Sequence, residues 1–455
     1  MIDLKNFFRP KSIAVIGVSR NPNKVGHVLL KNIIDAKYSG EIYAVNNKAD
    51  KVLGYKAYKS VLEINKKIDL AIISIPAEFV LQIVKECNKK KIKDLLIVTA
   101  GFSEVGNKKA EEELRNFILK NNMRLCGVNC LGILDTHNNF DSLFLPRDRL
   151  TRPSPGGISF VCQSGAIGSA ILDLATFQGH RFSKFISYGN ATTLDESDFI
   201  EYLGEDNSTK VICLYLEGVK DGKKFIRVMK KVSSKKPIIA IKGGITEEGH
   251  EATLSHTGSL AGNAQVYFGI FKQVGIIHAE TLGEMLTYAS MFEKSIKPKG
   301  NKVQVITNGG GYGILSTDAI SSSKNLIMSR LSKKTVSVLR KKLSSLINPR
   351  NPLDLLGDAD TQKYNNALEA CINDKNIDII LLIILYQTPL ITPGIVNVVT
   401  KFNKLKKKPI ITVSTGGKFT EELKKELEKH SIVTTTFPEE AVKGINALVE
   451  YYLKK

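Results

Sequence analysis

Tryptophan is absent from the 455 residues, and the chain has only 14 prolines and 6 cysteines. The cysteines form no C-x-x-C pair, and most lie in apolar runs: Cys87, Cys126, Cys130, Cys162, Cys213 and Cys371. This pattern argues against a disulfide framework and a cysteine-based metal site, and we expect no metal on this chain. Buried free thiols are typical of a reducing compartment, so we expect a cytoplasmic protein.

A long hydrophobic run is also missing. The longest candidate, 379–385, suits a buried parallel strand and is far shorter than the roughly 20 apolar residues that a membrane-spanning helix needs. Near the N-terminus, charged Asp3, Lys5 and Arg9 interrupt the sequence before the apolar core of a signal peptide could form. We therefore expect neither a membrane span nor a secretory leader.

Acidic residues are too few to balance the basic ones: 45 Asp and Glu face 65 Lys and Arg, a net charge of +20. Such a charge is compatible with nucleic-acid binding, but the lysines are spread along the chain and no basic stripe interleaved with aromatic residues occurs. We expect no nucleic-acid partner. The surplus charge indicates instead a lysine-rich surface that attracts phosphate-bearing small molecules.

Apolar runs alternate with helical stretches throughout the chain, which predicts an α/β fold with parallel sheets. A polar segment with three prolines and a second break with Pro298 and Gly300 divide this alternation. We expect a Rossmann-like domain followed by two flavodoxin-like domains. The predicted boundaries are 1–134 for the first domain, 135–157 for a linker or crossing loop, 158–293 for the second domain and 302–455 for the third.

Two glycine-rich turns stand where an apolar strand gives way to a helical pattern. Gln163, Ser164 and Gly165 follow the apolar run 158–162, and Asn308, Gly309, Gly310 and Gly311 follow the run 303–306. Such turns let backbone amides and the positive end of a helix face a phosphate group. Each turn alone has an ordinary alternative, because glycine there also permits tight packing.

His256 lies within Ser255–Gly262, among small residues that cannot pack a core. Imidazole can act as a base, a ligand or a covalent nucleophile, whereas a lone loop histidine more often only caps a turn. Together with the two glycine turns, the histidine suggests a phosphate that becomes bonded to imidazole. Glu217, at the end of the run 211–216, is placed to orient the ring, although it could equally cap the next turn.

The segment S-H-T-G-S-L-A-G and the two glycine turns resemble the NDP-forming acyl-CoA synthetases, the superfamily of succinyl-CoA synthetase, and most closely the α subunits of ADP-forming acetate–CoA ligases. The resemblance covers nearly the whole chain. It implies that His256 is phosphorylated during turnover with support from Glu217, and that both glycine turns bind phosphate. The implied reaction converts acyl-CoA, ADP and phosphate reversibly into a carboxylate, ATP and CoA.

The resemblance also makes the first domain a CoA-binding domain. The turn between Gly17 and Gly26 is not the G-x-G-x-x-G of NAD enzymes, and Lys48 stands near the position of their ribose-binding acid, which favours a ligand with an extra phosphate. The implied CoA contacts are Gly17, Val18, Ser19, Lys24, Lys48, Ser74, Ile75, Pro76, Ala77, Thr99, Ala100, Gly101 and Asn129. Ordinary strand-end turns of a Rossmann sheet are the alternative for these residues.

A nucleotide site is missing from the sequence. The segment 415–420 lacks the first glycine of a P-loop and the hydroxyl residue directly after Lys418. The resemblance implies that ADP or ATP, with Mg²⁺, binds to an ATP-grasp β subunit in an α2β2 complex. Two other interpretations stay open: a serine hydrolase with Ser164 as nucleophile and His256 as base, and a non-catalytic CoA-binding regulatory module.

Overall fold

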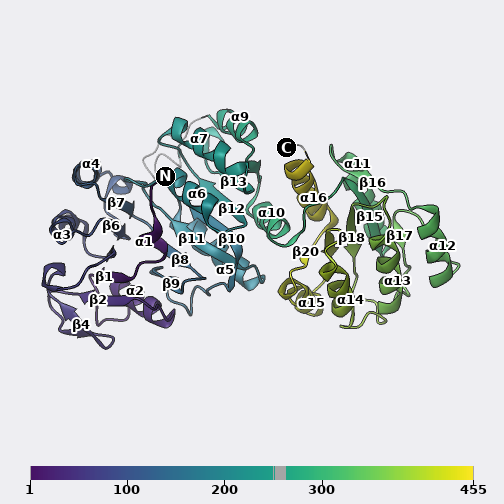
Figure 1. The fold of residues 1–455 in the computed structure, drawn as a ribbon, viewed down its shortest axis with the longest axis horizontal. Helices are drawn as coiled ribbons and strands as arrows, with labels where there is room; N and C mark the ends of the chain where they lie inside the picture. Colours follow the sequence, from purple (N-terminus) through teal and green to yellow (C-terminus); the bar gives the residue numbers. More distant parts are fainter. Residues whose placement is uncertain (1, 250, 252–262, 454–455) are drawn as a thin grey trace. The chain divides into compact units, whose positions relative to one another are not determined.

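The computed structural model of the chain describes residues 2–249, 251 and 263–453. They form two compact units, Met1–Glu280 and Thr281–Lys455, and Figure 1 shows helices beside the sheets of each. Three sheets account for the fold, two in the first unit and one in the second. The α/β prediction with parallel-dominated sheets is therefore confirmed.

The first sheet has seven strands in the order β3-β4-β2-β1-β5-β6-β7, and all pairs are parallel except β3 with β4. Strand order reverses between β1 and β5, which in open α/β sheets is where ligands bind. The strands are β1 (Ser12–Ile16), β2 (Glu41–Val45), β3 (Lys51–Val52), β4 (Tyr55–Tyr58), β5 (Leu70–Ile73), β6 (Asp94–Ile97) and β7 (Arg124–Gly127). The helices are α1 (Lys5–Phe8), α2 (Val25–Asp35), α3 (Ala77–Lys89) and α4 (Lys108–Lys120), with 3₁₀ turns η1 (Val61–Glu63) and η2 (Ser103–Val105).

The second sheet also has seven strands, in the order β14-β13-β12-β10-β11-β8-β9. Its strands are β8 (Gly132–Asp135), β9 (Phe140–Asp141), β10 (Pro155–Cys162), β11 (Phe182–Ser187), β12 (Val211–Leu216), β13 (Ile238–Lys242) and β14 (Ile277–His278). The described helices are α5 (Gly165–Phe177), α6 (Glu196–Glu205), α7 (Gly222–Ser233) and α9 (Ala264–Val274). Since β8 pairs antiparallel with β11 and β9 with β8, part of the segment interpreted as a linker at 135–157 lies in this sheet.

The third sheet has the path β16-β15-β18-β19-β20, with β17 paired to β15, and every pair is parallel. Its strands are β15 (Lys302–Thr307), β16 (Ile327–Met328), β17 (Leu353–Asp354), β18 (Ile379–Ile383), β19 (Ile410–Val413) and β20 (Val433–Thr435). The helices are α10 (Leu282–Lys294), α11 (Gly310–Ser322), α12 (Lys333–Lys342), α13 (Thr361–Ile372), α14 (Ile395–Lys404), α15 (Lys418–Lys429) and α16 (Pro438–Leu453). Helix α10 packs on α16 through Phe292 and Tyr451 and lies in this unit, although all of its residues except Lys294 fall within the predicted second domain.

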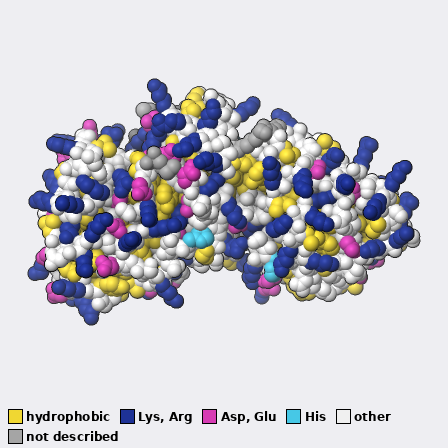
Figure 2. Space-filling view, viewed as in Figure 1, with side chains coloured by type: hydrophobic (Ala, Val, Ile, Leu, Met, Phe, Trp, Pro, Cys, Tyr) yellow, Lys and Arg dark blue, Asp and Glu magenta, His cyan; other side chains and the backbone are white. Residues whose placement is uncertain are grey.

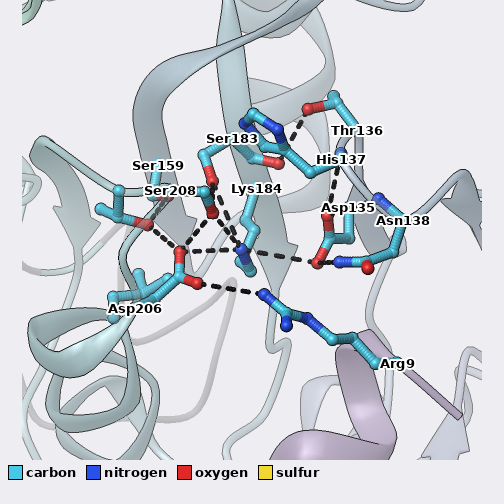
Figure 3. A network of polar contacts seen from close by, with 12 residues as sticks. Arg9, Asp135, Thr136, His137, Asn138, Ser159, Ser183, Lys184, Asp206 and Ser208 are labelled. Atoms are coloured by element: carbon cyan, nitrogen blue, oxygen red, sulfur yellow. Dashed lines mark hydrogen bonds and ion pairs between the residues drawn. The ribbon is translucent and has the colours of Figure 1, made fainter.

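A buried ionic network ties the N-terminal segment to the second sheet (Figure 3). The Nζ atom of Lys184, on β11, lies 2.8 Å from Asp206 Oδ2 and 3.4 Å from Asp135 Oδ2, and the lysine side chain is 0% exposed. Arg9 approaches Asp206 from the other side at 3.6 Å. Burial raises the pKa of Asp206, but hydrogen bonds from Lys184, Thr209 and Ser208 outweigh this effect and bring the pKa to about 2. The carboxylate is therefore ionised at neutral pH.

All six cysteines are buried and unpaired. No helix in the described part of the chain is long and apolar enough to cross a membrane.

Candidate functional site

A cavity of about 1130 Å³ lies at the carboxyl ends of the strands of the first sheet. Most of the predicted CoA contacts line it: Gly17, Val18, Ser19, Lys24, Lys48, Ser74, Ile75, Pro76, Thr99 and Ala100. Three predicted contacts do not. Ala77 begins α3, the amide of Gly101 donates to Glu104 at 2.5 Å, and Asn129 lines a neighbouring cavity instead.

Close backbone approach shapes the first turn of this cavity. Gly17 has a φ of +92°, and a Cβ atom there would lie 2.1 Å from the carbonyl oxygen of Ser74. A Cβ atom on Gly26, in the first turn of α2, would lie 1.9 Å from the carbonyl oxygen of Gly17. Only glycine fits at these two positions, so the start of α2 can pack directly against the turn.

Side chains that the sequence analysis missed complete the cavity. Asn46, the first residue after β2, donates to the carbonyl oxygen of Val18 at 2.6 Å and accepts from the amide of Lys48 at 2.7 Å. It therefore fixes the turn that carries Lys48. Lys59 and Phe79 also line the cavity, so three lysines, Lys24 among them, surround it. This cluster of cations suits a ligand with several phosphates.

Glu217 follows β12 and is 6% exposed. Its amide donates to Gln163 Oε1 at 2.8 Å, and the amide of Gly218 donates to the same oxygen at 3.3 Å. Since the carbonyl end of Gln163 is held by these two amides, its NH₂ group is left to act as a donor toward a ligand. The hydroxyl of Tyr215 donates to Glu217 Oε1 at 3.4 Å, and burial followed by the charge of Glu217 raises the pKa of that phenol.

The chain leaves β13, on its way toward His256 in sequence, beside Glu217. Strands β12 and β13 are paired in register from Ile212 with Ile238 to Leu216 with Lys242, so Gly243 leaves the sheet next to Glu217. Lys242 Nζ donates to the carbonyl oxygens of Glu217, at 2.8 Å, and of Gly243. Burial lowers the pKa of Lys242 to about 8, against the opposing attraction of Glu217. His256 itself lies outside the described residues.

The turn after β10 forms the wall of a second cavity, of about 380 Å³, to which Asn129, Gln163, Ser164 and Gly165 contribute. Ser164 is the N-cap of α5 and its Oγ accepts from the amide of Ile167 at 3.4 Å. The amides of Gly165 and Ala166 lie in the same first turn, where helical amides have no partner within the helix. The turn therefore presents donors and the positive helix end, as the anion-site prediction requires.

The corresponding turn of the second unit lies between β15 and α11. The side chain of Asn308 is used internally, because its amide nitrogen donates to the carbonyl oxygen of Leu385 at 3.1 Å and its Oδ1 accepts from the amide of the same residue at 2.9 Å. Gly309 is the N-cap of α11, and Gly310 and Gly311 are exposed. What this turn offers to an anion is thus backbone amides rather than the asparagine side chain.

The lysine and arginine side chains are spread over the visible face of the chain and interspersed with acidic ones (Figure 2). Among the described residues, no group of three or more His, Cys, Asp or Glu side chains is arranged to hold a metal ion.

Three family models match the chain in succession. They are a CoA binding domain at residues 11–136, a succinyl-CoA ligase like flavodoxin domain at 155–292 and a ligase-CoA domain at 303–452. The chain is 41% identical to the subunit alpha of acetate–CoA ligase [ADP-forming] II of Pyrococcus furiosus, over 98% of this chain and 97% of the relative. It is 40% identical to an acetate–CoA ligase [ADP-forming] of Methanocaldococcus jannaschii, of which it spans 64%.

A solved structure agrees with these matches. Acetyl-coenzyme A synthetase 1 of Candidatus Korarchaeum cryptofilum, determined in complex with phosphate and ADP, superposes with a TM-score of 0.93 at 33% identity, covering 99% of this chain and 97% of that one. Full-length similarity, three successive domain matches and the cavity geometry agree, and the chain belongs to the ADP-forming acetate–CoA ligase family.

Proposed function

We propose that the chain is the α subunit of an ADP-forming acyl-CoA ligase, the subunit that binds CoA and carries the phosphoryl group. The observation that carries this proposal is the junction of two cavities in the first unit. The lysine-lined cavity and the smaller cavity at the start of α5 share Val98, Ala100 and Phe144 in their walls. A phosphate-rich carrier in the first would deliver its thiol end to the second.

The lysines support CoA rather than NAD as the ligand. Lys48 lies three residues after β2, near the place where NAD enzymes have an acid, and it is exposed and lines the cavity together with Lys24 and Lys59. In calorimetry with the full chain, CoA should bind more tightly than dephospho-CoA, and K48M should reduce that difference. K56M is the matched control, because Lys56 is exposed on the adjacent strand β4 and does not line the cavity. Equal affinity for NAD and CoA would contradict the assignment.

The chemistry begins with attack of a phosphate oxygen on the thioester carbonyl carbon. The new C–O bond forms, the C–S bond breaks, and CoA leaves as a thiolate that takes up a proton. A ring nitrogen of His256 then attacks the phosphorus of the acyl phosphate and releases the carboxylate. Finally an oxygen of ADP attacks the phosphohistidine, which yields ATP and free imidazole.

Residues of the second sheet are proposed to serve these steps. The NH₂ group of Gln163, Ser164 and the amide of Gly165 hold phosphate, and Glu217 orients the imidazole and stabilises its phosphorylated form. In the second unit, the amides at Gly309, Gly310 and Gly311 form a further phosphate-binding turn that Asn308 shapes.

Radioactive phosphate and acyl-CoA test the phosphoryl transfer. The wild-type complex should acquire an acid-labile, alkali-stable label that H256N lacks. E217Q should slow labelling at least about tenfold, as loss of an orienting carboxylate does. E205Q is the control, because Glu205 is an exposed carboxylate on α6 of the same unit. Undiminished labelling of H256N would exclude this histidine as the acceptor.

A partner subunit completes the proposed enzyme. The Pyrococcus furiosus relative matched over 97% of its length is named a subunit alpha, whereas the Methanocaldococcus jannaschii ligase is longer and this chain spans 64% of it. We infer an ATP-grasp β subunit that binds ADP or ATP with Mg²⁺, and an α2β2 complex. These relatives are ligases by name, which favours catalysis over the regulatory module. The six unpaired cysteines support a cytoplasmic location.

The isolated chain tests the proposal that CoA binds to this chain and the nucleotide to a separate subunit. Purified without its partner, it should bind CoA but make no ATP from acetyl-CoA, ADP and phosphate. Robust ATP synthesis by the chain alone would show that the chain has its own nucleotide site and would refute the subunit proposal.

A further inference from the structure

The smaller cavity of the first unit holds no charged side chain among its described lining residues. Val98, Leu131, Phe144 and Leu145 give it apolar walls, while Asn129 and Gln163 stand on the polar side. Beside the donors of the turn at the start of α5, these apolar walls leave space for the uncharged hydrocarbon part of an acyl group. At about 380 Å³ it lies at the lower end of the range for small-molecule sites, with room for roughly a dozen water-sized atoms.

Phe144 occupies the junction of this space with the larger cavity. It is half-buried and lines both cavities, as Val98 and Ala100 do, but it is the only one of the three with a large side chain. Whatever is attached to the thiol of a ligand in the larger cavity therefore passes its ring.

The backbone on both sides of Phe144 is held by a single buried side chain. Asn32, on α2 and 2% exposed, donates from its Nδ2 to the carbonyl oxygens of Leu143, at 2.6 Å, and Leu145, at 2.9 Å. Helix α2 lies beside β9, which directly precedes this segment (Figure 1). The amide of Phe144 donates to the carbonyl oxygen of Leu131 at 3.3 Å.

A second anchor adds to this clamp. Arg152 Nη2 donates to the same carbonyl oxygen of Leu145 at 2.9 Å. An aromatic ring whose backbone is fixed at three successive residues cannot withdraw easily to admit a larger group. Its position thus sets a fixed limit on what the smaller cavity accepts.

We propose that Phe144, positioned by Asn32, is the residue that determines which acyl groups this chain accepts, by limiting their size where the CoA cavity meets the smaller, uncharged cavity. This inference rests on the proposed function. It names Phe144 as the specificity-determining residue and Asn32 as its positioning residue. Larger uncharged acyl groups, branched or aryl, are disfavoured relative to acetyl in proportion to the space that the ring takes.

Calorimetric binding of CoA, acetyl-CoA, isobutyryl-CoA and phenylacetyl-CoA to the full chain tests the proposal, with CoA as internal reference. F144A should raise the affinity for phenylacetyl-CoA relative to acetyl-CoA by about tenfold, the discrimination that a pocket gains from one or two carbon groups. F144L, which keeps an apolar side chain without the ring, should raise the affinity for phenylacetyl-CoA relative to acetyl-CoA by a smaller factor. N32A should also relax the discrimination, because it frees the backbone that carries the ring.

F79A is the matched control, since Phe79 lines only the larger cavity. It should change the affinities for CoA and all acyl-CoAs by a common factor and leave their ratios unaltered. If F144A and F144L bind CoA but leave the ratio of phenylacetyl-CoA to acetyl-CoA affinity within twofold of wild type, the inference is wrong while the proposed function stands. Absence of CoA binding by the wild-type chain would overturn both.

Discussion

Replacing Lys184 by methionine should destabilise the first unit severely. The Nζ atom is the shared partner of two buried carboxylates, Asp206 at 2.8 Å and Asp135 at 3.4 Å, whose side chains are 3% and 0% exposed. Removing one partner of a buried ion pair typically costs about 3–5 kcal/mol, because it leaves an uncompensated buried charge. Other donors remain here: Ser208 and Thr209 still donate to Asp206, and the side-chain amide of Asn138 to Asp135. We therefore expect the lower end of the range, about 3 kcal/mol.

The stability that K184M loses relative to wild type should become smaller as the pH falls. Because the folded-state pKa of Asp206 is lowered to about 2, its ionisation stabilises the fold fully above an unfolded-state pKa of about 3.9, and this contribution is lost as the pH falls through 2. The lowered pKa of Asp206 corresponds to about 2–3 kcal/mol of stability at neutral pH. Without Lys184 the carboxylate loses its main ionic partner. The stability gap between wild type and K184M should therefore narrow as the pH falls from 5 toward 3.

Urea unfolding of the full chain measures the effect. Far-UV circular dichroism is the suitable probe, because the chain has no tryptophan. Amide hydrogen exchange along β11 assigns the loss to the first unit. The matched control is K231M, which removes an exposed pair with Glu201 (side chains 44% and 21% exposed) and should cost at most about 1 kcal/mol. A triple variant K184M/D135N/D206N should recover much of the stability. If K184M stays within 1 kcal/mol of K231M, the network does not hold the fold as described.

Three further changes probe the site itself. G26A should abolish CoA binding or weaken it by more than about tenfold, since its Cβ would lie 1.9 Å from the carbonyl oxygen of Gly17, whereas G269A, at an open position on α9, should leave calorimetric binding unchanged. Q163L should leave the buried amides of Glu217 and Gly218 unpaired at about 1–3 kcal/mol each and lower the rate of phosphate labelling; labelling at the wild-type rate would refute this role. Because the folded-state pKa of Lys242 is lowered to about 8, wild type should gain stability relative to K242M as the pH rises from 7 to 10. Urea unfolding measures this difference in free energy between the two proteins, and a difference that stays constant over this pH range would contradict the lowered pKa.

Turns at strand ends could be predicted from the sequence, and contacts from other sheets could not. Gly17, Ser74 and Thr99, which the resemblance implies as CoA contacts, each follow an apolar strand, and parallel strands place such residues at one edge of the sheet. Phe144 reaches the same cavity from a segment after β9, beside the second sheet. The Asn32 contacts that hold it span more than 110 residues of sequence. No local pattern reports a contact of that kind.

The segment 135–157, expected to be a linker, contributes strand residues to the second sheet because these strands are very short. Strand β9 has only two residues, Phe140 and Asp141, too few for any alternation to appear in the sequence. Its role comes from pairing with β8, which itself pairs antiparallel with β11. Proline and polar residues dominate the rest of 135–157, so composition alone favours a loop.

The position of Glu217 beside the end of β13 follows from parallel-strand geometry more than from any motif. Strands β12 and β13 are in register up to Leu216 and Lys242, so the chain leaves both strands at the same level of the sheet edge. A Cβ atom on Gly243 would lie 2.5 Å from the Tyr215 hydroxyl, so a larger residue there would require the tyrosine that donates to Glu217 to shift. The Lys242 ammonium group donates to the carbonyl oxygens of Glu217 and Gly243, and so holds the residues that follow β12 and β13 side by side. The sheet thus holds the Glu217 carboxylate beside the point where the chain leaves β13, as the proposed role of Glu217 requires.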